Sequence, residues 1–94
     1  MARFLITVPH PPETLACARV VDAFLKTGSH WVTNADWGCK DGDHTAWLIV
    51  DADDKDEARQ ILPAAFRADA RIVRLNKFMK DEIETVLREH RRQG

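Results

Sequence analysis

HTAWLIVD, residues 44–51, decides the fold of this 94-residue chain. Its central run AWLIV is continuously apolar, which is typical of a strand buried on both faces. The preceding KDGD, residues 40–43, supplies glycine and aspartate, the residue types that tolerate turn geometry. The pattern therefore predicts a hairpin whose first, weaker strand is WVTNADWGC, residues 31–39, and whose second strand is residues 44–51.

The segments on either side of this hairpin alternate between strand and helix. RFLITV, residues 3–8, predicts a first strand that ends at a proline cluster. Gly28 is the expected stop of the helix that follows, whose apolar stripe comprises Leu15, Cys17, Ala18, Val20, Val21, Phe24 and Leu25. Asp54 and Glu57 form a capping box for a second helix, which Pro63 must end or kink. Residues 70–78 alternate as a fourth strand, and residues 80–92 predict a terminal helix with an acidic start and a basic end.

The predicted order is therefore β-α-β-β-α-β with an added terminal helix. This is the ferredoxin-like pattern of an α+β protein. Right-handed crossovers then give a four-stranded antiparallel sheet in the order 4-1-3-2, with two helices over one face. A chain of this length is expected to form one domain, residues 1–94.

The sheet face without helices is expected to be apolar. Strand parity turns one set of side chains toward the helices, namely Phe4, Ile6, Val8, Ala46, Leu48, Val50, Val73 and Leu75. The opposite face would carry Leu5, Thr7, Trp47, Ile49, Ile72, Arg74 and Asn76, with Asp36 opposite Trp47 and Asn34 opposite Ile49. This is too much apolar surface to leave in water, so we expect a homodimer with sheet against sheet. The alternative is that the terminal helix folds over this face within one subunit.

A ligand pocket would follow from that dimer. Polar side chains at the dimer interface would line a cavity between the sheets together with Trp47, and the expected lining residues are Thr7, Asn34, Asp36, Arg74 and Asn76. Asp36 against the Trp47 indole would be a desolvated carboxylate able to shuttle protons as a catalytic group. The alternative for Asp36 is a structural contact with Arg74 or with the backbone.

Four segments resemble the dimeric α/β-barrel superfamily, most of all its muconolactone-isomerase-like and related small members. They are FLITV, GSHW, DADDKDEARQILP and ARIVRLNKF, which span most of the chain. The resemblance implies a homodimer of ferredoxin-like subunits with a pocket between sheet and helices or between the two sheets. It implies no particular chemistry and assigns no catalytic residue. Our hypothesis for the function is that this pocket binds a small carbonyl or carboxylate compound, in an isomerase-like or other enzyme that needs no cofactor.

A second candidate site lies at the end of the hairpin. The predicted strand order brings His10, Cys39 and His44 to one edge of the sheet. A thiolate with two imidazoles suits zinc or copper and would leave one coordination position open, although the C-x4-H spacing matches no standard zinc signature. His10 and His44 could instead act as catalytic acid–base groups, or the stretch could be only a polar turn. Cys17 is expected to pack on the apolar stripe of the first helix.

Composition argues against several other classes of protein. The net charge of −1 provides no attraction to nucleic acid or to anionic membrane, and the third strand lacks the basic, aromatic motif of RNA-binding sheets. No apolar run approaches the roughly 20 residues of a membrane span. Two cysteines are too few for a disulfide framework. We therefore expect a cytoplasmic protein with reduced thiols and neither nucleic acid nor membrane as a partner.

Overall fold

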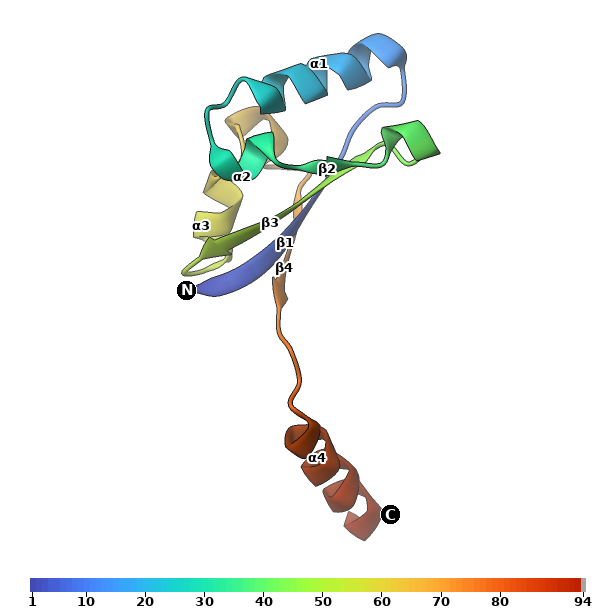
Figure 1. Ribbon diagram of the computed structural model, residues 1–94, viewed down its shortest axis with the longest axis vertical. Coiled ribbons are helices and arrows are strands. Elements are labelled where there is room, and N and C mark those ends of the chain that lie inside the picture. The colour runs from blue at the N-terminus through green and yellow to red at the C-terminus, as the bar shows by residue number, and fades with distance from the viewer. Residues whose placement is uncertain (94) are drawn as a thin grey trace.

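The structure is a computed structural model that describes residues 1–93. Four strands pair into one antiparallel sheet, and three helices lie over one of its faces (Figure 1). The strands are β1 Ala2–Pro9, β2 Asp36–Trp37, β3 Thr45–Ala52 and β4 Arg71–Leu75. The helices are α1 Thr14–Leu25, α2 His30–Thr33, α3 Lys55–Gln60 and α4 Lys80–Gln93, with short 3-10 turns η1 Cys39–Asp41 and η2 Ala64–Phe66.

The strands lie in the order β2-β3-β1-β4, which is 4-1-3-2 counted from the other edge. All three strand pairs are antiparallel. The α+β architecture with a four-stranded antiparallel sheet, expected from the sequence, is therefore confirmed. Helix α3 begins where the sequence predicts, because the Asp54 carboxylate accepts a hydrogen bond from the Glu57 amide at 2.8 Å.

The core lies between the sheet and α1–α3. All the residues of β1 and β3 that strand parity turns toward the helices are buried in it: Phe4, Ile6, Val8, Ala46, Leu48 and Val50. Ala52 and Ile72 are also buried in this core. From α1 only Val20 and Phe24 are buried, whereas Leu15 and Leu25 of the predicted stripe are mostly exposed. Helix α1 is therefore attached to the sheet by a narrow apolar contact.

The assignment of faces on β4 was wrong. Ile72 is 7% exposed and pairs with Ile6, so it faces the helices, because directly opposed residues share a face of the sheet. Val73 and Leu75 consequently lie on the opposite face. Arg74 shares the parity of Ile72, and Asn76 follows the end of the strand, so neither belongs to the predicted pocket. The sequence is ambiguous here because β4 has apolar residues at both parities.

The strand predicted for residues 31–39 is correct only at Asp36 and Trp37. Residues 30–33 form α2 instead, and the Ser29 hydroxyl caps it by accepting a hydrogen bond from the Val32 amide. The side-chain Nδ2 of Asn34 donates to the His30 carbonyl at 2.7 Å, and Asn34 does not pair with Ile49. Local hydrogen bonds from serine and asparagine outweigh the strand propensity of this stretch.

The sheet face opposite α1–α3 carries Leu5, Trp47, Ile49, Val73 and Leu75, which we call the open sheet face. Each of these residues is half-buried or exposed, and Ile49 is 50% exposed. Cross-strand pairing confirms that they share a face, since Leu5 lies opposite both Ile49 and Val73.

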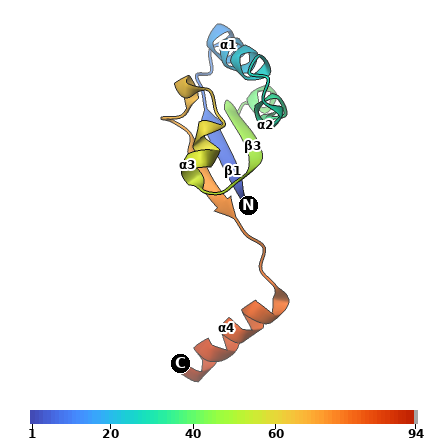
Figure 2. The same ribbon diagram turned by 90° about the vertical axis from the view of Figure 1, so that its left-hand side faces the viewer.

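Helix α4 stands apart from this layered body. Figures 1 and 2 show it beyond the end of the sheet, and each of its described side chains is exposed. The radius of gyration is 17.6 Å, against about 12 Å for a compact chain of this length. The terminal helix does not fold over the open sheet face of its own subunit. Within residues 1–93, no helix has the length and apolar character needed to cross a membrane.

Candidate metal centre

Four potential metal ligands meet at the end of the sheet, beneath α1. His10 follows β1, Cys17 lies on α1, Cys39 begins η1, and His44 precedes β3. One donor atom from each side chain can be chosen so that all four lie within 4.8 Å of one another. The predicted trio of His10, Cys39 and His44 is thus close together in space, and it has a fourth member.

Strand parity explains why three of these side chains converge. His10 lies two residues beyond Val8 and therefore continues the helix-facing parity of β1. Cys39 and His44 continue the same parity on the two arms of the hairpin. The His10 amide donates to the His44 carbonyl at 3.0 Å, which extends the pairing of β1 with β3 to the site.

The hairpin turn holds Cys39 in place through two glycines. The Gly38 carbonyl accepts hydrogen bonds from the amides of Asp41 and Asp43 at 2.9 and 3.0 Å. A Cβ atom on Gly38 would lie 2.6 Å from the Asp43 carbonyl oxygen, so no larger residue fits without movement. Gly42 adopts φ 85°, a left-handed conformation that favours glycine.

Cys17 is the residue that sequence reasoning missed. It was expected only to pack, but its sulfur lies 3.5 Å from the Cys39 sulfur. Cys17 lies on the same side of α1 as the buried Val20 and Phe24, at helical spacing. That stripe faces the same side of the sheet as His10, and this shared face was the available signal.

The imidazoles contact both the thiols and an aromatic wall. His10 Nε2 lies 3.2 Å from the Cys39 sulfur, and the His10 and His44 rings meet edge to face at 5.5 Å. Trp37 closes the other side of His10, at 5.6 Å between ring centroids. The Nδ1 atoms of both histidines are buried without a hydrogen-bond partner. Leaving a buried imidazole nitrogen unpaired costs roughly 1–3 kcal/mol.

Electrostatics set the protonation of the metal-free site. Burial, followed by the neighbouring His44, lowers the pKa of His10 from its ordinary value of 6.5. The hydrogen bond to Cys39, followed by burial, raises the pKa of the Cys17 thiol. At neutral pH the His10 imidazole is therefore neutral and ready to donate a lone pair, whereas Cys17 must lose a proton to bind a metal.

The spacing of the donor atoms suits a tetrahedral ion. Tetrahedral zinc with sulfur and nitrogen ligands places donor pairs roughly 3.4–3.8 Å apart. The observed contacts of 3.2 and 3.5 Å are close to this range, and the widest pair, at most 4.8 Å, has to close by about an ångström. Hollows of about 330 and 370 Å³ lie beside the sulfurs and give solvent access.

The other predicted site residues do not join this cluster as ligands. Asp36 lies opposite Trp47, as predicted, but it is exposed, so one subunit does not form the closed cavity expected around it. Thr7 pairs with Trp47 across the sheet and shares its face. Of the predicted pocket residues, Thr7 and Trp47 thus belong to the side of the open sheet face, whereas Asn34, Arg74 and Asn76 lie elsewhere.

Comparison of the chain with known protein families, curated proteins and solved structures finds no match. The chemistry of the cluster is therefore the basis for assigning a function. Two thiols and two imidazoles from three separate segments are a ligand set that zinc commonly takes.

Proposed function

We propose that this protein binds a zinc ion through His10, Cys17, Cys39 and His44. The observation that carries the proposal is the convergence of four donor atoms within 4.8 Å. Because Cys17 supplies a fourth ligand, the open position expected for a three-residue site is filled. A closed set of two cysteines and two histidines is typical of structural zinc, so the ion serves the fold and takes no part in a reaction.

A structural ion would act where the packing is weakest. Helix α1 buries only two side chains, and β2 is only two residues long. Zinc would tie α1, the end of β1 and the hairpin to one point. It would also bond one nitrogen of each imidazole.

Metal analysis of the untagged protein tests this proposal. We expect one zinc per chain, and we expect Co²⁺ to replace it with the intense absorption of a thiolate-bound tetrahedral ion. His44→Gln should lose the metal, whereas the matched control His30→Gln should keep it, because His30 is exposed and outside the cluster. Wild-type protein that takes up neither ion at neutral pH under reducing conditions would overturn the proposal.

The open sheet face favours a second candidate function. We propose a ferredoxin-like homodimer of the dimeric α/β-barrel type that encloses a small carbonyl or carboxylate compound and has isomerase-like chemistry. The support is the apolar surface around Trp47 and the 50% exposure of Ile49, which a second subunit would cover. Thr7 and Asp36 supply polar groups beside Trp47.

Sedimentation and a thermal-shift screen of small carboxylates test this second candidate. We expect a dimer at micromolar concentration and at least one compound that raises the Tm. Trp47→Leu should abolish that shift, whereas Trp31→Leu should not, because Trp31 lies on α2 and away from the open sheet face. A monomer with no compound bound would refute it and leave the zinc proposal untouched.

A further inference from the structure

Two apolar surfaces lack a partner among the described residues of the subunit. One is the open sheet face. The other is a stripe on and just before α4, formed by Met79, Ile83, Val86 and Leu87, which we call the α4 stripe. Its members are 64%, 39%, 60% and 51% exposed, and their spacing of three and four residues puts them on one side of the helix.

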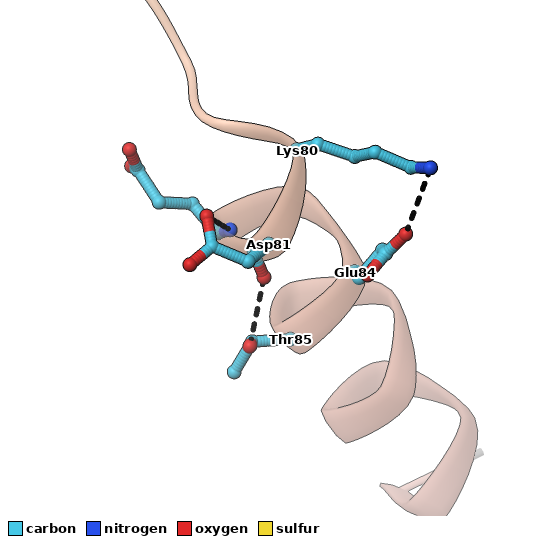
Figure 3. Close-up of polar contacts among 5 residues, drawn as sticks. Lys80, Asp81, Glu84 and Thr85 are labelled. Carbon is cyan, nitrogen blue, oxygen red and sulfur yellow. Dashed lines mark hydrogen bonds and ion pairs between the residues drawn. The ribbon is translucent and has the colours of Figure 1, made fainter.

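Helix α4 needs an external contact to be stable. An isolated helix of 14 residues is marginal in water, and helices in proteins gain most of their stability by burying an apolar side. The polar contacts in Figure 3 are internal to the helix: Lys80 pairs with Glu84 at 3.8 Å, and the Thr85 hydroxyl donates to the Asp81 carbonyl at 2.9 Å. They support the helix without anchoring it to the sheet.

The connection to α4 directs the helix away from its own sheet. Residues 76–79, NKFM, contain neither glycine nor proline, and Asn76 is the one residue among them of a type common in turns. In Figures 1 and 2 this segment runs on beyond the end of β4 and carries α4 past the sheet. A second copy of the chain can meet the helix there.

Charges around the two surfaces are complementary. On the side of the open sheet face, Arg3 and Arg71 lie on β1 and β4, and Asp36 and Asp51 lie on β2 and β3. Arg3 and Asp51 are directly opposed on the two central strands. All four are exposed.

The α4 stripe has flanks of opposite charge in the same way. Helical spacing puts Glu82 and Glu89 along one flank. The other flank carries Lys80 and Arg91, together with Glu84, which pairs with Lys80. Helix α4 of a second copy could lie along the strands in either of two opposite directions. In one of these directions its acidic flank would lie against the arginines and its basic flank against the aspartates.

The dimensions of the two surfaces also agree. Fourteen residues of α-helix extend about 21 Å. The eight residues of β1 and β3 extend about 26 Å, and four strands span roughly 14–19 Å. One helix can therefore cover the apolar centre of the open sheet face.

We propose that the protein forms a symmetric homodimer by exchange of α4, with the α4 stripe of each copy packed on the open sheet face of the other. The contact between the α4 stripe and the open sheet face occurs twice, and a two-fold axis relates the two copies, as in a closed symmetric dimer. It puts a helix where sheet-against-sheet packing would put a second sheet, so it is an alternative to the dimeric α/β-barrel arrangement and excludes that arrangement. It does not depend on zinc.

Photo-cross-linking of the full-length protein tests this arrangement. A photoreactive benzoylphenylalanine replaces Val86, and ¹⁴N-labelled and ¹⁵N-labelled chains are mixed before irradiation. We expect links between differently labelled chains that join α4 to peptides of β1 or β3. Links confined within one chain would show that α4 folds back on its own sheet. In a second variant the same photoreactive residue replaces Ile49. Links from this position to β3 of the other chain, or a protein that remains monomeric, would equally overturn the proposal.

A pair of charge insertions on α4 provides a matched control. Val86→Asp places a charge on the α4 stripe and should weaken the dimer about 100-fold, since two copies of the contact lose buried apolar surface. Thr85→Asp places the same charge on the outward side of the helix and should change the dimer dissociation constant less than about threefold. Equal effects of the two substitutions in sedimentation would show that the stripe is not an interface.

Discussion

Replacing Cys17 with serine tests whether the cluster is a four-ligand site. The side chain is half-buried, and its sulfur lies 3.5 Å from that of Cys39. Serine is similar in size and still donates a hydrogen bond, so the metal-free variant should lose no more than about 1 kcal/mol of stability. A hydroxyl is a much poorer zinc ligand than a thiolate, so the main loss should be in zinc binding.

The size of the expected effect follows from linkage between binding and folding. Zinc at 100 times its Kd stabilises the folded state by about 2.7 kcal/mol. In a domain of this size each kcal/mol shifts the Tm by roughly 4–8 °C. Zinc should therefore raise the Tm of the wild-type protein by about 10–20 °C, and Cys17→Ser should remove most of that rise.

Calorimetry of the wild-type protein and the variant, with zinc and with a chelator, measures the four Tm values needed. His30→Gln is the matched control and should keep the full rise, because His30 is exposed and lies outside the cluster. A Cys17→Ser variant that keeps the wild-type rise would refute the reasoning, because Cys17 would then not be a ligand.

Three further predictions concern the cluster and the hairpin turn that holds Cys39. Zinc affinity should fall as pH falls, since the thiols must lose their protons and the pKa of Cys17 is raised; competitive titration at several pH values measures this. The lowered pKa of His10 implies that the unfolded chain binds its proton more readily, so denaturant titrations of metal-free protein should show stability declining as pH falls below 6.5. Gly38→Ala should cost roughly 1–3 kcal/mol, because its Cβ would lie 2.6 Å from the Asp43 carbonyl oxygen; chemical denaturation checks this, and an unchanged midpoint would contradict it.

The sequence alone determined most of the elements and the α+β class with its four-stranded antiparallel sheet, but not the structure of residues 31–39. AWLIV is too apolar for an edge, and it lies in β3 between β2 and β1. Asp54 marks the start of α3 because its side chain satisfies a free amide of the first turn. His10, Cys39 and His44 could be brought together from strand order and parity, since both follow from short-range rules.

Only the tertiary structure decided which faces are buried where the local pattern is ambiguous. Ile72, Val73 and Leu75 are apolar at both parities, and the pairing of Ile72 with Ile6 selects the buried one. Residues 30–33 have aromatic and β-branched side chains, yet the Ser29 cap makes them helical. Cys17 joined the cluster because packing of Val20 and Phe24 sets the rotation of α1 over the sheet. Helix rotation and strand register depend on contacts between distant segments, which no periodicity within one segment specifies.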